Sequence, residues 1–170
     1  MKDSREKFGK IYDKYIDKIF RFVFVKVDSQ QAAEDLTSEV FSKTWAFFKK
    51  KGDEIENIQA FLYKTARNLV VDYYRQKGRV RIVSTDDPVH TGLIDPNQNL
   101  VKTAELNSDI RNIKSALTGL KDDYQNVIIC HYLNDMSISE ISKTLGKTEG
   151  NTRVLLHRAL ESLKKKVEKV

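Results

Sequence analysis

The chain has 170 residues, of which 40% are hydrophobic and 32% are charged, so it is long enough for one domain or two small ones. The 30 basic residues outnumber the 24 acidic ones by six, and the pI is near 9.3. This charge suits a polyanionic partner without requiring one. Two prolines and seven glycines favour long helices over a turn-rich β fold, and they exclude a collagen-like chain.

A single cysteine, Cys130, excludes an intrachain disulfide, and its apolar neighbours predict a buried thiol. The first residues lack the apolar stretch of a signal peptide. The apolar run at residues 22–25 is far shorter than the ~20 residues that cross a bilayer. We therefore expect a cytoplasmic protein without membrane insertion.

Three helices are predicted in the first half of the chain. Apolar residues recur at three- and four-residue steps over residues 8–23. A second helix is expected to open at Asp28, with Gln31 completing a capping box, and to end at Gly52. A third starts near Asn57 and has one apolar side and one largely basic side.

Composition changes sharply in the middle of the chain. Residues 82–110 contain one basic and five acidic residues, and they include both prolines, Pro88 and Pro96. No helical apolar period is visible there, which is typical of a linker. The sequence therefore predicts an all-α protein of two small helical domains, residues 1–80 and 108–170, joined by a flexible acidic linker at residues 81–107.

The second half contains a helix-turn-helix pattern. Ser137 and Glu140 have the spacing of a capping box, Gly146 follows a short amphipathic helix, and Thr148 caps a basic helix. A short helix, a glycine turn and a basic helix can place the second helix in the major groove of DNA. The alternative is an ordinary helical hairpin with a solvated basic face.

Three motifs occur in series: AEDLTSEVF at residues 33–41, AFLYKTARN at 60–68 and GNTRVLLHRA at 150–159. In order and spacing the chain resembles an extracytoplasmic-function (ECF) sigma factor of bacterial RNA polymerase, over about residues 8–78 and 108–167. The resemblance implies a transcription initiation factor that directs core polymerase to specific promoters. Its first domain would melt the minus-ten element and read it as a single strand, and its second would read the minus-thirty-five element as duplex.

The resemblance implies that the second predicted helix carries a polymerase-binding face. Its carboxylates would pair with basic side chains of the polymerase clamp, and the family often has glutamine where this chain has serine. A plain solvated helix face is the alternative, and the leucine is equally suited to the core. The candidate polymerase-binding residues are Asp35, Leu36, Ser38 and Glu39.

The resemblance also implies that the minus-ten strand passes along the third helix, with a flipped base read by the loop at residues 49–57. Basic grooves and rings that accept unstacked bases hold single strands. The loop contains no ring, and Phe48 at its border is the nearest one. Tyr63, Tyr73 and Tyr74 are candidates for stacking on bases. Core packing is the alternative role for these tyrosines and is favoured for Tyr73. The candidate minus-ten residues are Tyr63, Lys64, Arg67, Asn68 and Arg75.

The basic helix supplies the candidate minus-thirty-five residues by the same resemblance. The chain departs from the family at Val154 and Leu155, where members commonly have a small polar and then a basic residue, so an unusual sequence preference is expected. For His157, the alternative to DNA contact is a surface position without a partner. The candidates are Thr148, Asn151, Arg153, His157 and Arg158.

The expected partners are core RNA polymerase and promoter DNA, with an anti-sigma factor as a further candidate. The acidic linker would thread the polymerase cleft or act as a plain spacer. No cofactor, metal site or enzymatic activity is expected, because the three histidines lie in separate segments and no phosphate-binding glycine loop occurs. The alternatives are a free-standing helix-turn-helix regulator and, more remotely, a nuclease that uses the acids at Glu34, Asp35 and Glu39.

Overall fold

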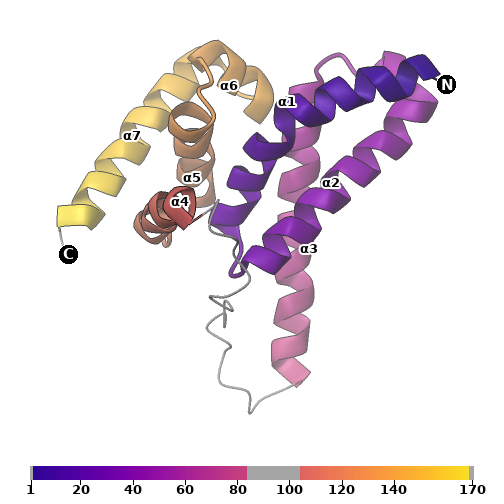
Figure 1. Cartoon of the computed structure of the whole chain (residues 1–170). Coiled ribbons are helices and arrows are strands. Elements are labelled where there is room, and N and C mark those ends of the chain that lie inside the picture. Colours follow the sequence, from indigo (N-terminus) through magenta and orange to yellow (C-terminus); the bar gives the residue numbers. More distant parts are fainter. Residues whose placement is uncertain (1, 84–103, 169–170) are drawn as a thin grey trace.

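The computed structural model describes residues 2–83 and 104–168, and the regular elements in those ranges are all helical (Figure 1). This confirms the predicted all-α class. The elements are α1 (Lys2–Lys26), α2 (Gln30–Lys51), the 3₁₀ turn η1 (Gly52–Glu54), α3 (Ile58–Val83), α4 (Ala104–Leu117), α5 (Asp122–Ile128), the π-helical turn η3 (Ile129–Leu133), α6 (Ile138–Leu145) and α7 (Glu149–Glu168).

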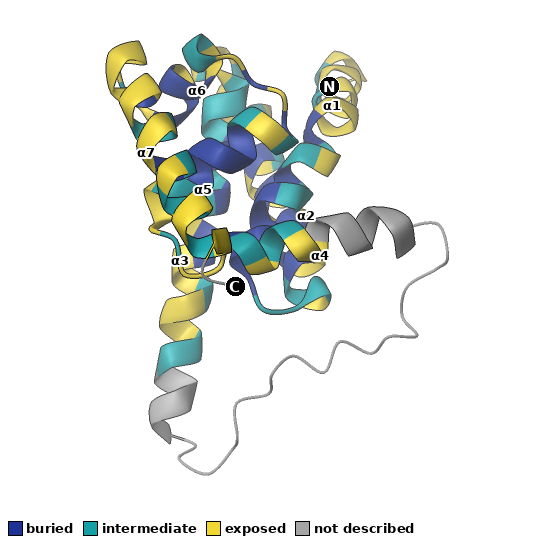
Figure 2. Ribbon diagram, turned by 90° about the vertical axis from the view of Figure 1, so that its left-hand side faces the viewer, coloured by how far each residue is buried: buried dark blue, intermediate teal, exposed yellow. Residues whose placement is uncertain are grey.

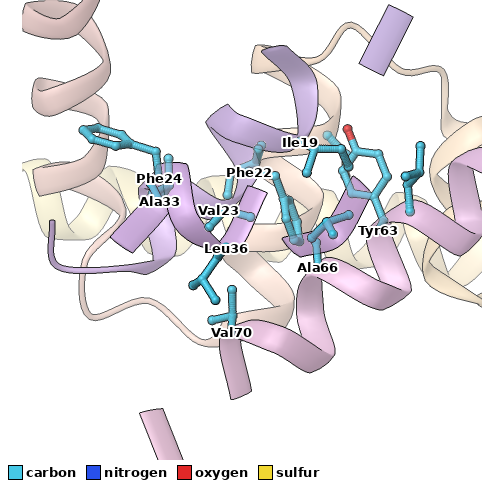
Figure 3. Close-up of a cluster of buried hydrophobic side chains, with 14 of the residues drawn as sticks. Ile19, Phe22, Val23, Phe24, Ala33, Leu36, Tyr63, Ala66 and Val70 are labelled. Atoms are coloured by element: carbon cyan, nitrogen blue, oxygen red, sulfur yellow. The ribbon is translucent and has the colours of Figure 1, made fainter. Parts of the chain in front are cut away.

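The first half is built from α1, α2 and α3, whose apolar stripes face one another as the periodicity predicts. Phe22 and Tyr63 meet at the centre of this cluster with ring centroids 5.0 Å apart (Figure 3). Leu36 of α2 and Val70 of α3 are also buried in it. The three helices therefore share one core and leave their polar faces to solvent.

The start of α2 differs by one residue from the prediction. Ser29, not Asp28, is the N-cap, and its hydroxyl accepts a hydrogen bond from the amide of Ala32. The carboxylate of Asp28 instead accepts a hydrogen bond from the Tyr73 hydroxyl at 2.6 Å and pairs with Lys77. Two distant partners on α3 thus hold a side chain that local spacing assigned to a helix cap.

The second half follows its predicted pattern closely. The Ser137 hydroxyl accepts from the amide of Glu140, whose carboxylate accepts from the Ser137 amide, so the capping box is confirmed. Gly146 ends α6 at φ 67°, a left-handed conformation that favours glycine. Thr148 then caps α7 by accepting from the amide of Asn151. The helix-turn-helix geometry is therefore present.

Both ends of the predicted linker are helical. Helix α3 continues through Val83 and α4 begins at Ala104, so the segment between the helices is shorter than 81–107. No proline occurs between Asn57 and Pro88, and the chain can therefore extend α3 beyond its amphipathic part. The rest of the predicted linker, residues 84–103, lies outside the described residues.

The two halves pack against each other through α1 with α4 and η3, and through α3 with α6. Asn134 lies at the centre of this contact and is 1% exposed. Its side-chain oxygen accepts from Nε of Arg21, while its amide nitrogen donates to the Tyr63 hydroxyl at 2.7 Å and to the Lys18 carbonyl. The sequence pattern of two domains and a linker did not predict this contact between the halves, because the residues that form it are far apart in the chain.

Candidate nucleic-acid interface

Helix α2 presents an acidic face to solvent. Asp35, Ser38 and Glu39 are all exposed, and Asp35 accepts a hydrogen bond from Gln31 one turn earlier. Glu39 lies 3.6 Å from Lys43 in a solvent-exposed pair. Such pairs contribute little to stability, so these carboxylates can exchange partners at small cost. Leu36, placed in the same predicted set, is only 8% exposed and packs in the core.

A largely apolar hollow of about 810 Å³ lies between α1 and α2, beside this acidic face. Ser38 and Glu34 form part of its lining, so the hollow adjoins the predicted polymerase-binding residues. Half of the remaining lining residues are aromatic or aliphatic, namely Phe8, Tyr12, Ile16, Phe20, Phe41 and Trp45. The arrangement offers an apolar surface with an acidic border.

The predicted minus-ten residues lie on two sides of α3. Lys64, Asn68 and Arg75 are exposed, whereas Arg67 is half-buried. The Nε atom of Arg67 is buried and has no hydrogen-bond partner within the described part of the chain. Lys64 and Arg67 line a second hollow, and Arg75 lies 3.6 Å from Asp72.

That hollow, of about 580 Å³, brings the predicted reading loop and α3 together. Phe47 of α2 and Phe61 of α3 form part of its wall, with ring centroids 5.0 Å apart. Ile55 and Asn57 of the loop complete this side. The loop itself contains no ring, so the sequence prediction missed these two aromatics, although one ring lies on each side of the loop in the chain.

Tyr63 is not on the surface. It is fully buried, hydrogen-bonded to Asn134, and its burial raises the pKa of its hydroxyl well above the ordinary value. In this arrangement it cannot stack on a base. Tyr73 is half-buried against the first-half core, as its place in the apolar stripe indicates, and Tyr74 is 44% exposed.

Four of the five candidate minus-thirty-five residues lie on the outer face of α7, and the fifth, Thr148, caps its start. Figure 2 shows exposed residues along this helix. Arg153 lies 3.5 Å from Glu149, and His157 lies 3.3 Å from Glu161, both in exposed pairs one turn apart. Asn151 and Arg158 are exposed as well. Side chains with donors and acceptors for base edges and phosphates thus share one accessible face.

Other kinds of site find no support in the described residues. Within residues 2–83 and 104–168, no three His, Cys, Asp or Glu side chains gather in a way that could hold a metal ion. No helix of the described ranges is long and apolar enough to span a membrane. Cys130 is buried as expected, and its burial raises the pKa of the thiol to about 12.

Comparisons with known proteins match both halves in order. The family model "Sigma-70 region 2" covers residues 11–80, and "Sigma-70, region 4" covers residues 110–163. The chain is 29% identical to the ECF RNA polymerase sigma factor BldN of Streptomyces coelicolor along 92% of its own length, which corresponds to 58% of BldN. It is 26% identical to SigM of Bacillus subtilis, with 91% of each chain covered.

Solved structures support the fold. The sigma factor RpoE of Bartonella quintana, crystallised with the anti-sigma factor NepR, matches 96% of this chain with a TM-score of 0.71 and 23% identity. CnrH, solved with the cytosolic domain of CnrY, matches 97% with a TM-score of 0.68 and 15% identity. Because both sigma-70 regions are matched in sequence order and ECF sigma factors align along nine-tenths of its length, the chain belongs to the sigma-70 family as an ECF RNA polymerase sigma factor.

Proposed function

We propose that this chain is a transcription initiation factor that binds core RNA polymerase and directs it to promoters with specific minus-ten and minus-thirty-five elements. The observation that carries the proposal is the presence, in one chain, of an acidic face on α2, a basic exposed side on α3 and a capped recognition helix α7. A free-standing helix-turn-helix regulator needs only the last of these. The proposed domains are residues 1–80 and 108–170.

The α2 surface is the proposed contact with the polymerase clamp. Asp35 and Glu39 supply negative charge to the clamp, and Ser38 lies where the acidic face meets the apolar hollow. An apolar contact with a charged border favours both affinity and correct orientation. Leu36 is buried beneath this surface and helps to hold α2 on the core.

The hollow at the end of α2 is the proposed receptor for an unstacked minus-ten base. Phe47 and Phe61 offer ring faces or edges, and Asn57 provides polar groups beside them. Lys64 and Arg67 add positive charge for the backbone of the strand. Stacking on a ring offsets part of the few kcal/mol needed to extrude a base. Asn68 and Arg75 continue the basic path along α3.

On α7, Arg153 is the proposed reader of a guanine edge, since arginine can donate to O6 and N7 together. Asn151, His157 and Arg158 lie on the same exposed face and are proposed to contact bases or phosphates. The start of α7 is proposed to hold a phosphate through its remaining first-turn amides, since the Thr148 hydroxyl already caps the amide of Asn151. The chain is proposed to have no catalytic activity of its own.

An anti-sigma factor is a further proposed partner. Of two structurally similar chains, the sigma factor RpoE was co-crystallised with the anti-sigma factor NepR, and CnrH was solved in complex with the cytosolic domain of CnrY. The apolar hollow between α1 and α2 is a surface that such a regulator and polymerase could compete for. The proposed place of action of the chain itself is the cytoplasm, where core polymerase is found.

The test is transcription with purified bacterial core polymerase on genomic DNA, with and without this protein, followed by mapping of the RNA 5′ ends. New start sites that share two upstream elements are expected only when the protein is added. Footprinting should then show both elements protected. Tight sequence-specific binding of the free protein to duplex DNA, with no new start sites, would instead support the free-standing regulator.

A further inference from the structure

Val154 is an apolar side chain on the polar outer face of α7. It is 50% exposed, although the residues one turn before and after it, Asn151 and Arg158, are polar and also exposed. The sides of α7 that pack on the core are occupied by other residues, with Thr152 and Ala159 fully buried. Val154 therefore does not serve the core.

Valine is also a poor choice for a purely solvated helix position. Its branched Cβ restricts χ1 in a helix, and alanine or a long polar residue would form the helix more readily. An exposed apolar side chain contributes no hydrogen bond to the solvent around it. A second molecule that covers the side chain would remove this apolar group from water.

We infer that Val154 reads the 5-methyl group of a thymine in the minus-thirty-five element, an inference that rests on the proposed function of α7. In the major groove, thymine is distinguished by its methyl group, and apolar side chains make this contact. Val154 lies in the first two turns of α7, which is the part of a recognition helix that reaches base edges. Its neighbours supply the polar contacts.

The side chains around Val154 suit a DNA partner better than a protein partner. Val154, Asn151 and Arg158 line a polar hollow of about 610 Å³ together with Lys121 and Lys147. The two carboxylates in its wall each have a cation: Asp122 pairs with Lys26, and Asp123 lies 3.8 Å from Lys147. Tyr124 and Leu155 complete the wall, and cations beside apolar side chains suit a phosphate backbone next to a base methyl.

The experiment uses holoenzyme assembled from the full chain and core polymerase, on a promoter mapped as described above. Each thymine of the minus-thirty-five element is replaced in turn by deoxyuridine, which removes only the methyl group. At one position the apparent affinity is expected to fall about fourfold, the effect of losing one buried methyl-sized contact. The substitution Val154→Ala should remove this sensitivity and bind the thymine promoter as weakly as the wild type binds the deoxyuridine one.

Two variants separate the contact from general effects. Val154→Thr retains a γ-methyl and should keep most of the discrimination between thymine and deoxyuridine. Val167→Ala alters another exposed valine of the same helix, 57% exposed and three turns away, and should discriminate like the wild type. Circular dichroism of both alanine variants should show unchanged helix content, because alanine favours helix.

The outcomes also distinguish this inference from the proposed function. If the wild-type holoenzyme protects no minus-thirty-five element, the proposed function of α7 fails. If the element is protected but no thymine is sensitive to methyl removal, or the element has no A·T pair, the inference about Val154 alone is overturned. Equal sensitivity in wild type and Val154→Ala would overturn it as well.

Discussion

Asn134 shows how one buried amide can connect the two halves of the chain. It accepts from Arg21 and donates to Tyr63 and to the Lys18 carbonyl, so its oxygen and its amide nitrogen both have partners. A buried polar group without such partners costs about 1–3 kcal/mol. The same contact removes Tyr63 from the surface, where the sequence prediction had placed it beside DNA.

We expect Asn134→Ala to lower the free energy of unfolding by about 1–3 kcal/mol, because it leaves the buried Tyr63 hydroxyl without its donor. Tyr63→Phe in the Asn134→Ala background should cost little more. Urea unfolding of the four proteins of this double-mutant cycle measures the coupling. Strictly additive effects of the two substitutions would contradict the proposed link.

Arg153→Ala should weaken recognition of the minus-thirty-five element by about 1–3 kcal/mol, because a bidentate contact to a base is lost. The exposed ion pair with Glu149 contributes little to the fold, so stability should change by less than about 0.5 kcal/mol. The measurement is transcription from promoters with and without that element. Lys164→Ala, which removes an exposed charge farther along α7, is the control.

At the scale of elements, helix positions were predictable where local signals are strong. The capping box of α6, the glycine after it and the N-cap of α7 all follow from short-range spacing. The Asp28 prediction was wrong because Ser29 has equal capping chemistry and Asp28 finds partners on α3. The C-terminal end of α3 and the N-terminal start of α4 were not predicted, because both helices extend beyond the part that has an amphipathic pattern.

The exposed face of α2 carries the proposed contact with the polymerase clamp. Glu39→Lys should impair association with core polymerase, because it reverses a charge on the proposed clamp contact while leaving the buried face of α2 intact. Co-elution with core polymerase on a sizing column is the measurement. Glu6→Lys reverses a charge on α1 that is also exposed and should co-elute like the wild type. Unchanged co-elution of the Glu39 variant would refute this contact.

Helix α4 provides a pH dependence through Lys114, which donates to the Val27 carbonyl across the contact between the halves. Burial lowers the pKa of this amine to about 8, from 10.5 in the unfolded chain. Between these values the unfolded state binds more protons, so the free energy of unfolding rises with pH. The expected gain is about 1–2 kcal/mol once solvent screening is allowed for.

Urea unfolding of wild type and Lys114→Met at pH 8 and pH 10.5 measures this effect as a difference. Cys130 acts in the opposite direction above pH 9, because burial raises the pKa of its thiol to about 12. That effect is present in both proteins and cancels. A difference that stays constant over the interval would show that Lys114 is not responsible.

At the scale of the molecule, the packed arrangement has a functional consequence. Residues 143–146, at the end of α6, line the same hollow as Phe47, Phe61 and Lys64, and Thr144 accepts a hydrogen bond from Gln59 of α3. The second half therefore sits against the proposed minus-ten site. Promoter elements about 25 base pairs apart are separated by about 85 Å, whereas a compact chain of this length has a radius of gyration of about 15 Å.

We therefore expect the halves to separate when the chain binds polymerase and promoter. Dyes on Asp72→Cys of α3 and Glu161→Cys of α7, both exposed, report the distance by energy transfer. Cys130 is buried and resists labelling because its thiol ionises only at high pH. Transfer should be efficient in the free protein and fall in the promoter complex. Equal efficiency in both states would contradict the separation.

Local sequence patterns predict the helical class, the bounds of α6, the start of α7 and the family, because periodicity, capping spacing and three ordered motifs are properties of neighbouring residues. It also indicated which faces of α2 and α7 would be exposed. Tertiary packing buries Tyr63 on Asn134, brings Phe47 and Phe61 together beside the reading loop, and joins the two halves. These depend on contacts between residues far apart in the chain, which no local pattern encodes.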